Sequence, residues 1–384
     1  MSTDSLHNNT LRVAIAGGGT GGHIIPALAI AEELQRTLID QSVFAKVSFL
    51  FFGSDYGMET KMIPEAGFEL VTLPIRGLSR SISLSGFKRN LMLPGRLAVS
   101  INRANKSLRS FNPHILVGTG GYASAIPVRQ ALRNQIPVVL QEQNSYPGMV
   151  TRLFASKAKQ IFLTYEDAKQ YLKGANTLLT GNPIREFSTR VNKQQVADFF
   201  GLSPELPTLF ILGGSQGARA LNEHFIHKSA LYLDKLDMQI LWQTGRTDYE
   251  YCQRHVGTNS RITLVPFIND MEKAYSLADL MVCRAGAMTL TEINHFGLPA
   301  ILIPLPSAAA NHQEFNARSQ EQVGAARVVL ESELNEGAFL PILTEIFTDR
   351  DRLIQMSQAS KALRKPDAAK EICNSILRIV NSCV

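Results

Sequence analysis

Two stretches of the chain share one pattern of apolar strand, glycine-rich loop and helix. The first begins with VAIAGGGTGGHIIPALA at Val13, and the second is TLFILGGSQGARALNEHFI at Thr208–Ile226, with Gly213 about 195 residues after its counterpart Gly18. After each copy, short apolar runs that end in glycine or polar residues alternate with helical spacing. This repetition predicts an α/β fold of two Rossmann-like domains in tandem, and the cleft between them is the expected site.

The length of 384 residues agrees with two domains, because single cores rarely grow beyond about 250–300 residues. The strand and helix pattern restarts after GNPIREF, and the last part of the chain has helical character. We therefore expect an N-terminal domain over residues 1–183, a C-terminal domain over 184–355 and terminal helices over 356–384.

Composition limits the setting in which the chain works. The polar start MSTDSLHNNT lacks the apolar core of a signal peptide, and no run of roughly 18 apolar residues predicts a membrane span. The four cysteines form no C-x-x-C pair and the eight histidines are scattered, which indicates neither a disulfide framework nor a metal centre. These features favour a cytosolic protein with no metal and no other cofactor.

The net charge of +6 is distributed unevenly. Residues 70–141 contain no Asp or Glu, but they carry the basic residues Arg76, Arg80, Lys88, Arg89, Arg96, Arg103, Lys106, Arg109, Arg129 and Arg133. The centre, LSRSISLSGFKRNLMLPGRLAV, mixes bases with apolar residues, and an anionic membrane attracts each nearby base by about 1 kcal/mol. Since aromatic residues for base stacking are sparse, a membrane surface is favoured over nucleic acid. The alternative is a solvated basic face whose apolar residues belong to the core.

Three glycine loops follow predicted strands, at residues 17–22, 118–121 and 213–217. Glycine permits a positive φ and close approach to a ligand, and the next helix offers N–H groups to a phosphate. A dinucleotide fingerprint needs an acidic residue about 20 positions later, whereas the first one after the second strand is Asp55. A P-loop needs Lys after the last glycine, but Gly22 is followed by His23. The first loop therefore fits neither class.

A further phosphate loop is predicted in CRAGAMTLTE, residues 283–292. Gly286, Ala287, Met288 and Thr289 would present backbone N–H groups and a hydroxyl to a diphosphate. Glu292, one turn into the helix, could accept hydrogen bonds from both hydroxyls of a ribose, because a carboxylate only accepts. The alternative is an ordinary glutamate favoured by the helix dipole.

Seven motifs, in this order and spacing, resemble those of the MurG-type transferases of peptidoglycan synthesis: GGGTGGHIIPALA, GTGGYASAIPV, EQNSYPG, TGNPIR, ILGGSQGAR, PFIND and RAGAMTLTE. The resemblance covers nearly the whole chain. It implies a GT-B architecture of two facing Rossmann-like domains, with the C-terminal helices crossing back to the first domain. It also implies an inverting, metal-independent transferase that moves N-acetylglucosamine from UDP-GlcNAc to the C4 hydroxyl of the lipid-linked N-acetylmuramyl-pentapeptide. This step converts lipid I to lipid II at the cytoplasmic face of the bacterial inner membrane, where the enzyme is peripheral.

The resemblance assigns substrate-binding residues by matching motifs. For UDP-GlcNAc these are Thr20, Gly21, Gly22, Asn144, Arg185, Ser215, Ile268, Ala287, Met288, Thr289, Leu290, Thr291, Glu292 and Gln313. Arg185 and Ser215 would contact the diphosphate and Ile268 the uracil through its backbone. Asn144 and Gln313 would contact the sugar. For the acceptor the residues are Gly118, Thr119, Gly120, Gly121 and Tyr122.

Three positions depart from the family pattern. Gln141 stands where the family motif H-E-Q-N begins with histidine, D-x-Q-Q appears as Asn311–Glu314, and Ala285 replaces a serine. The first departure removes that histidine from essential chemistry, and the second leaves one glutamine of two to hold sugar hydroxyls.

His23 is the candidate base for the acceptor hydroxyl, since the unperturbed pKa of histidine near 6.5 suits proton uptake at neutral pH. The alternative is a histidine that only orients the acceptor diphosphate. The charge of departing UDP would be met by Arg185, the Ser215 hydroxyl and the helix N-terminus at Ala287. A D-x-D sequence, which often holds a metal in other transferases, occurs at Asp349–Asp351 and is interpreted as a helix end.

The basic apolar segment would dock the enzyme to the membrane that holds its acceptor. Its inserting side chains would be Ile75, Leu78, Leu84, Phe87, Leu91, Met92 and Leu93. Its lipid-binding bases would be Arg80, Lys88, Arg89 and Arg96. Two other functions stay open. A UDP-GlcNAc 2-epimerase shares the architecture and donor but leaves the basic segment unexplained, and a nucleotide-binding peripheral membrane protein leaves the acceptor loop unused.

Overall fold

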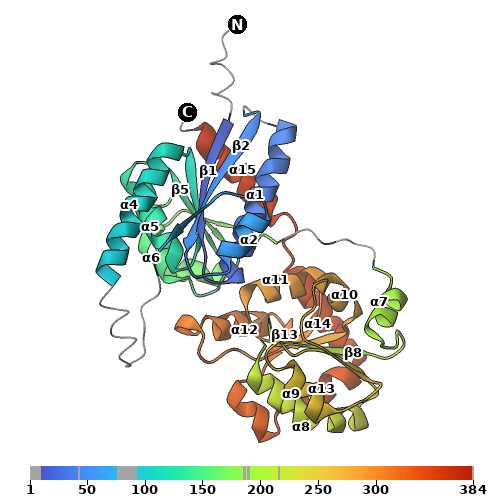
Figure 1. Ribbon diagram of the computed structural model, residues 1–384. Coiled ribbons are helices and arrows are strands. Elements are labelled where there is room, and N and C mark those ends of the chain that lie inside the picture. The colour runs from blue at the N-terminus through green and yellow to red at the C-terminus, as the bar shows by residue number, and fades with distance from the viewer. Residues whose placement is uncertain are drawn as a thin grey trace. The chain divides into compact units, whose positions relative to one another are not determined.

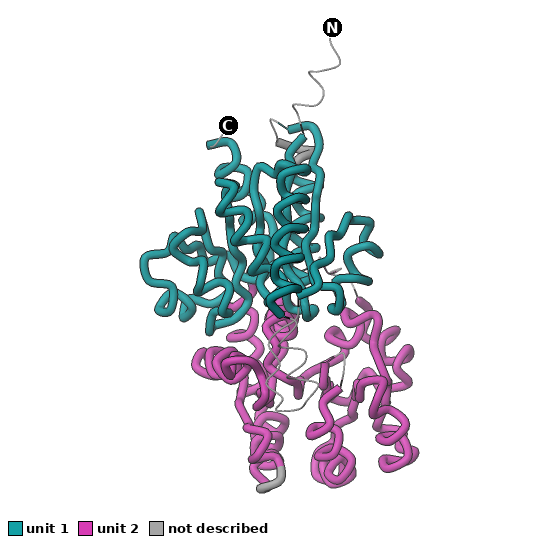
Figure 2. The backbone as a smooth tube through the Cα atoms, turned by 60° about the vertical axis from the view of Figure 1, so that its left-hand side comes forward, with its two compact units in different colours: residues 1–185, 365–384 teal, residues 186–364 magenta. Residues whose placement is uncertain are grey.

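The computed structural model describes residues 10–41, 44–75, 93–184, 187, 191–214 and 217–382. The chain forms two compact units (Figure 2): unit 1 comprises Met1–Arg185 with Lys365–Val384, and unit 2 comprises Glu186–Arg364. Each unit has one parallel sheet with helices on both of its faces (Figure 1). The predicted fold class of two Rossmann-like domains is confirmed.

The sheet of unit 1 has seven strands in the order β3-β2-β1-β4-β5-β6-β7. These are β1 (Thr10–Gly17), β2 (Lys46–Ser54), β3 (Leu70–Leu73), β4 (Ile115–Gly120), β5 (Val138–Glu142), β6 (Gln160–Leu163) and β7 (Thr177–Leu179). Side chains alternate between the two faces, as the pleat of a strand requires: Val13 and Ile15 enter one core cluster, while Ala14 and Ala16 enter the other.

Helices cover both faces of this sheet. One face carries α1 (Gly21–Gln41), α2 (Glu59–Glu65) and α15 (Ala368–Asn381). The other carries α4 (Leu93–Phe111), α5 (Ala125–Arg133) and α6 (Met149–Phe154). Short 3₁₀ turns complete the unit at η2 (Tyr122–Ser124), η3 (Ala155–Lys157) and η4 (Glu166–Tyr171).

Unit 2 has six strands in the order β10-β9-β8-β11-β12-β13. They are β8 (Thr208–Leu212), β9 (Gln239–Gln243), β10 (Ile262–Val265), β11 (Leu280–Cys283), β12 (Ala300–Leu302) and β13 (Ala326–Val328). One face packs against α7 (Lys193–Phe200), α10 (Met271–Leu277), α11 (Ala287–Phe296) and α12 (His312–Gln322). The other packs against α8 (Arg219–Lys235), α9 (Tyr249–Val256), α13 (Phe339–Thr348) and α14 (Arg350–Ala362). The turns η5 (Ala309–Asn311) and η6 (Glu331–Glu336) lie between these elements.

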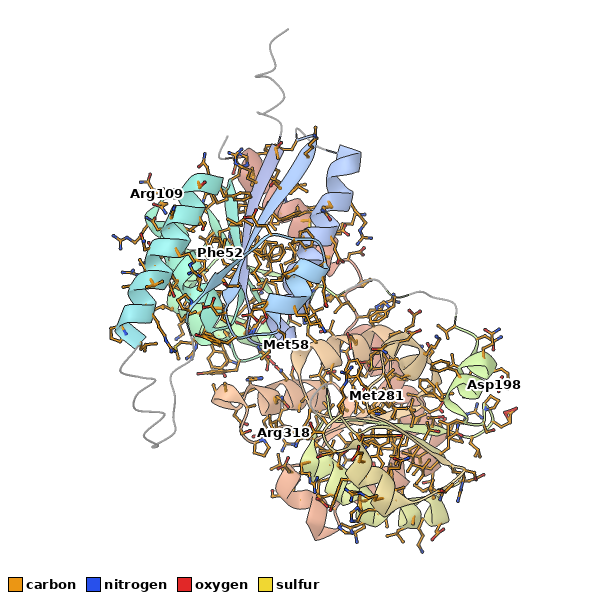
Figure 3. All side chains as sticks on the ribbon, in the orientation of Figure 1. Phe52, Met58, Arg109, Asp198, Met281 and Arg318 are labelled. Atoms are coloured by element: carbon orange, nitrogen blue, oxygen red, sulfur yellow. The ribbon has the colours of Figure 1, made fainter. Side chains whose placement is uncertain are left out.

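Burial separates core from surface in both units. Phe52 and Met281 are fully buried, whereas Arg109 and Arg318 are exposed on their helices (Figure 3). The cysteines Cys252, Cys283 and Cys373 are buried and free.

The two terminal helices belong to different units. The Ser360 hydroxyl of α14 donates to Asn294 Oδ1 at 3.1 Å, so this helix packs on α11 within unit 2. In α15, Ile372, Cys373 and Ile376 are buried in the cluster that contains α1. The chain therefore returns to unit 1 at Lys365, later than the expected start of the terminal helices at residue 356. Asp349 caps α14 by accepting from the Arg352 N–H at 2.9 Å, which makes it a helix end.

Candidate active site

In each unit, the predicted loops leave neighbouring strands at the same edge of the sheet. In unit 1 they follow β1, β4 and β5, which are adjacent in the sheet. In unit 2 they follow β8, β11 and β10; β8 and β11 are adjacent in the sheet, and β9 lies between β8 and β10. Because the carboxyl ends of parallel strands meet at one edge, each set of loops forms a cluster, as in other doubly wound folds.

His23 lies in the first turn of α1, where the glycine loop fixes its ring. Its Nδ1 is 3.1 Å from the carbonyl oxygen of Gly18 and 3.2 Å from Thr20 Oγ1. A carbonyl oxygen only accepts, so the Gly18 contact favours the tautomer of the neutral ring with its proton on Nδ1. The lone pair is then on Nε2, which is the nitrogen that can take up a proton.

The β4 loop packs directly against this histidine. Gly120 has φ +99°, and a Cβ there would lie 2.8 Å from His23 Cδ2. Gly121 has φ +76°, and a Cβ there would overlap the Gly18 carbonyl oxygen. Thr119 is fully buried and its hydroxyl donates to the His23 carbonyl at 2.8 Å. Gly118 is enclosed by Leu140 and Val128, so of the predicted acceptor residues only Gly120, Gly121 and Tyr122 are partly exposed.

Glu59, at the start of α2, is a residue of this loop cluster that the sequence did not reveal. It is fully buried, and Oε2 accepts a hydrogen bond from the Gly19 N–H at 3.0 Å. Oε1 accepts from the N–H and the hydroxyl of Ser54 at 2.8 and 2.7 Å. The only local signal is the pair of glycines, Gly53 and Gly57, that precede it.

The loop after β5 is built around Glu142. Its Oε1 accepts from the backbone and side-chain amides of Asn144 at 3.1 and 3.2 Å. Its Oε2 accepts from the Gly148 N–H at 2.9 Å and the Thr151 hydroxyl at 2.6 Å. Burial raises the pKa of this carboxyl, while those four hydrogen bonds favour its ionised form. The Asn144 side chain is thereby oriented with its amide nitrogen toward Glu142.

Gln141, the residue that replaces the family histidine, is buried below this loop. Its Nε2 donates to Asn182 Oδ1 at 3.1 Å, and its Oε1 accepts from Gln143 Nε2. Gln143 Nε2 also lies 2.7 Å from the Thr119 carbonyl oxygen. The substitution therefore places a neutral amide in a network that ties the β5 loop to the β4 loop.

In unit 2, α11 presents its N-terminus at the end of β11. Its N-cap is Gly286, and the N–H groups of Ala287, Met288 and Thr289 occupy the first turn, where the helix dipole is positive. Leu290 is 1% exposed and belongs to the core, and the Thr291 hydroxyl donates to the Ala287 carbonyl at 2.9 Å. Ala285 is fully buried, with its carbonyl accepting from Asn316 Nδ2 at 3.3 Å.

Glu292 is held by a tyrosine from the preceding helix. The Tyr275 hydroxyl donates to Glu292 Oε2 at 2.6 Å, and Tyr275 itself is 1% exposed. No pattern in the sequence pointed to Tyr275, because it lies in a different helix and its contact with Glu292 exists only in the folded unit.

Gln243, at the end of β9, joins the two loops on either side of it. Its Oε1 accepts from the Ile268 N–H at 2.8 Å, and its Nε2 donates to the Gly214 carbonyl at 3.2 Å. The N–H of Ile268 is therefore engaged within unit 2. Gln313 Oε1 accepts from the Leu305 N–H at 3.0 Å, which directs the amide nitrogen of that side chain away from Leu305. Glu314, in place of the second glutamine, pairs with Arg318 at 3.9 Å within α12.

Several predicted residues lie outside the described part of the chain. They are Arg185 and Ser215 in the nucleotide loops and Leu78, Arg80, Leu84, Phe87, Lys88, Arg89, Leu91 and Met92 in the docking segment. The prediction that Ile75 inserts into a membrane is wrong, because Ile75 is 9% exposed and packs in the core beside Leu73. Arg96 is partly exposed, and the exposed bases of the acid-free segment on α4 and α5 are Arg103, Lys106, Arg109, Arg129 and Arg133.

Within the described ranges, no group of three or more His, Cys, Asp or Glu side chains is arranged to hold a metal ion. The described helices include none that is both long and apolar enough to cross a membrane.

Comparison with known proteins relates both units of the chain to the same family of glycosyltransferases. Residues 13–163 match the glycosyltransferase family 28 N-terminal domain, and residues 208–372 match the glycosyltransferase family 28 C-terminal domain. The UDP-N-acetylglucosamine–N-acetylmuramyl-(pentapeptide) pyrophosphoryl-undecaprenol N-acetylglucosamine transferase of Chlorobaculum tepidum is 37% identical over 373 residues, which cover 97% of this chain and all of the relative.

Solved structures agree with this relationship. The crystal structure of Acinetobacter baumannii MurG aligns with a TM-score of 0.73 at 27% identity, covering 96% of this chain and 99% of the other. The UDP-GlcNAc 2-epimerase of Neisseria meningitidis, bound to UDP-GlcNAc, aligns with a TM-score of 0.65 at 12% identity, covering 96% and 100% of the two chains. The second likeness shows a common fold alone.

The two doubly wound units and the family 28 matches to both of them define a glycosyltransferase of the GT-B class. Within that class, the chain belongs to the MurG-type family of UDP-N-acetylglucosamine–N-acetylmuramyl-(pentapeptide) pyrophosphoryl-undecaprenol N-acetylglucosamine transferases. The resemblance seen in the seven motifs is confirmed.

Proposed function

We propose that the protein transfers N-acetylglucosamine from UDP-GlcNAc to the C4 hydroxyl of the N-acetylmuramyl-pentapeptide of lipid I, giving lipid II. The observation that carries this proposal is the 37% identity to the Chlorobaculum tepidum transferase over 97% of this chain. That relative is named for this donor and acceptor. Since the likeness spans both units, it covers the residues proposed for both substrates.

The proposed reaction is a single displacement at the anomeric carbon. The acceptor oxygen attacks from the side opposite UDP, its proton passes to His23 Nε2, and the C1–O bond breaks with its electron pair on the diphosphate. One displacement inverts the configuration at that carbon. The Nδ1 contact with the Gly18 carbonyl supports His23 as the base, because it leaves the lone pair on Nε2.

The donor is proposed to bind at the loops of unit 2. The first-turn N–H groups of α11, together with Arg185 and Ser215, would stabilise the charge of departing UDP, which is the basis for proposing a metal-independent reaction. The Glu292 carboxylate would accept from the ribose hydroxyls. Since the Ile268 N–H is engaged by Gln243, its carbonyl oxygen is the backbone group that would accept from the uracil ring.

For the sugar and the acceptor, polar groups are proposed in each unit separately. Gln313 would donate to the sugar through its amide nitrogen, because its oxygen is used by Leu305. Asn144 would offer its amide oxygen, because its nitrogen is used by Glu142. Thr20, Gly21 and Gly22 would lie beside the donor sugar and the acceptor diphosphate, and Gly120, Gly121 and Tyr122 would flank the acceptor.

The assay that tests the proposed function measures UDP release from UDP-GlcNAc with and without a soluble lipid I analogue. We expect release that depends on the acceptor and a disaccharide product with inverted anomeric configuration. Isomerisation of the donor without acceptor would instead establish the epimerase alternative. Nucleotide binding without any turnover would instead support the alternative of a non-catalytic nucleotide-binding protein.

The enzyme is proposed to bind peripherally to an anionic membrane surface on the side of α4 and α5. The exposed bases there, from Arg103 to Arg133, support this proposal, because lipid-linked acceptor requires the enzyme to approach the bilayer. In a vesicle-flotation assay we expect binding to rise with the fraction of anionic lipid and to fall when salt is raised from 0.1 to 0.5 M. Binding that ignores lipid charge would contradict this docking mode.

A further inference from the structure

The Glu59 carboxylate is an unusual feature of unit 1, because it is fully buried and bound to three hydrogen-bond donors. One donor is the Gly19 N–H in the loop after β1, and the other two belong to Ser54 at the end of β2. A buried carboxylate is costly unless such bonds compensate for lost hydration. Glu59 therefore joins the end of β2 to the loop at Gly19, which lies 40 residues before Glu59 in the chain.

Three glycines make room for this carboxylate. A Cβ at Gly53 would lie 2.5 Å from Glu59 Cγ, and a Cβ at Gly18 or Gly57 would overlap the carboxyl group itself. The Tyr122 hydroxyl extends the same network by donating to Ser54 Oγ at 3.3 Å. The backbone of two loops is thus shaped around the side chain of Glu59. Through Ser54 and Tyr122, the same network also reaches the β4 loop.

Glu59 and His23 bind the two ends of one peptide group. The N–H of Gly19 donates to Glu59 Oε2, and the carbonyl of Gly18, in the same trans peptide, contacts His23 Nδ1 at 3.1 Å. In a trans peptide these two groups point in opposite directions, so the carboxylate, the peptide and the imidazole form a chain of hydrogen bonds. Such chains polarise one another, and each bond strengthens the next.

We propose that Glu59 is a positioning residue that acts on His23 through the Gly18–Gly19 peptide. The carboxylate holds that peptide in one orientation, and the peptide carbonyl then holds the imidazole with its proton on Nδ1. The arrangement resembles the carboxylate–histidine pair of hydrolytic triads, with a peptide group interposed between the two side chains. This inference rests on the proposed function, because it assigns to His23 the uptake of the acceptor proton.

The Glu59→Gln substitution tests this proposal in the full-length protein. The amide nitrogen of the introduced glutamine would face one of the three hydrogen-bond donors. The Gly18–Gly19 peptide would therefore lose its fixed orientation. We expect kcat to fall tenfold or more, while the KM for UDP-GlcNAc stays within twofold. The acid limb of kcat/KM for the acceptor should also move to lower pH, because the imidazole loses a polarised acceptor. Unchanged kcat and an unchanged pH profile would overturn the proposal.

The pH profile also depends on the other titratable groups around this loop. On the described elements packed about it these include Asp55 and Tyr56 before α2, Lys61 and Glu65 on α2, Tyr122 on η2, Glu142 at the end of β5, and Lys370 and Glu371 on α15. Asp55 lies 4.0 Å from Arg103, and Glu142 accepts four hydrogen bonds within its own loop. Along α1, Glu33 and Arg36 pair with each other at 2.7 Å, about three helical turns from His23.

A double-mutant cycle separates positioning from a general loss of structure. If Glu59 acts through His23, Glu59→Gln should lower kcat by less than twofold in a His23→Ala background. Equal losses in both backgrounds would show a merely structural role and overturn the proposal. Asp279→Asn is the matched control, because Asp279 also accepts a hydrogen bond from a backbone N–H, that of Thr208 at 2.8 Å. Asp279 lies in unit 2, at the amino ends of strands β8 and β11, away from the predicted loops. The kcat of this variant should stay within twofold of the wild type.

A measurement on the wild-type protein is decisive even if Glu59→Gln fails to fold. Nitrogen-15 spectra of the histidine rings, with His23 assigned from its alanine variant, should show the Nδ1–H tautomer at high pH. The Nε2–H tautomer would overturn the proposal. This result does not depend on turnover, whereas absence of acceptor-dependent UDP release by the wild type would count against the proposed function alone.

Discussion

Glu292 and Tyr275 are joined by a 2.6 Å hydrogen bond across 17 residues of sequence. The Tyr275 ring packs against Phe210 and Phe296 with centroid distances of 6.1 and 5.2 Å, so its hydroxyl is a fixed donor. This donor occupies one carboxylate oxygen and orients the other. If Glu292 binds the ribose hydroxyls as proposed, it depends on such support, because ordering a freely rotating carboxylate would cost entropy on binding.

Tyr275→Phe should therefore weaken the donor site without altering the chemical step. Loss of a hydrogen bond to a charged group costs about 1.5–3 kcal/mol, and we expect the KM for UDP-GlcNAc to rise roughly tenfold with kcat nearly unchanged. Steady-state kinetics with varied UDP-GlcNAc provide the measurement. The control is Tyr251→Phe, which removes a similar bond to Glu223 Oε2 at 3.3 Å on the opposite face of the sheet. An equal rise in KM for both variants would contradict a specific role of Tyr275.

Residues such as Glu292 and His23 could be predicted as candidates because they stand inside motifs with fixed spacing. Tyr275, Gln243 and Glu59 could not, since each acts on a residue that only the folded sheet brings near it. A buried polar side chain also carries no periodic signal. For Glu59 the glycines of GSDYGME were visible, but a glycine that approaches a carboxylate looks the same in sequence as one that approaches a ligand.

At the level of elements, the interior strands and the edge strand β10 were predictable from the sequence, and the other three edge strands were not. β1, β5 and β8 are buried along most of their length and read as apolar runs. The strands β3, β7 and β13 at the sheet edges have only four, three and three residues and were missed. Edge strands are commonly short, and the partial exposure of β3 and β7 removes the continuous apolar run on which a prediction depends.

The glycine loop after β1 shows how an element can be predicted while its role is not. Its spacing indicated a phosphate loop, yet the Gly19 N–H donates to Glu59, and the Gly18 carbonyl contacts His23. Gly19 has a positive φ, and a Cβ there would lie 3.3 Å from Tyr122 Cε1, so this glycine permits close packing between the two loops. The N–H of Gly19 is therefore engaged within unit 1 rather than offered to a phosphate.

At the scale of the whole molecule, each unit has a separate core, and the last helix contributes to the core of the first unit. Ile376 of α15 and Ile346 of α13 are both fully buried, but they belong to clusters in different units. Substitution of a buried isoleucine by alanine costs about 2–5 kcal/mol, because it leaves a cavity. Two compact units with their own cores are expected to unfold in two transitions.

The two isoleucines allow the donor site to be located without any turnover. In differential scanning calorimetry, Ile376→Ala should lower only the unfolding temperature of unit 1. Ile346→Ala should lower only the unfolding temperature of unit 2. UDP at a hundred times its dissociation constant should stabilise its binding unit by about 2.7 kcal/mol. We expect UDP to raise the unfolding temperature of unit 2, which is the one that Ile346→Ala lowers. The reason is that the α11 N-terminus, Glu292 and Ile268 all lie in unit 2. If UDP instead raised only the transition that Ile376→Ala lowers, the nucleotide would bind to unit 1, and the proposed roles of α11 and Glu292 would be wrong.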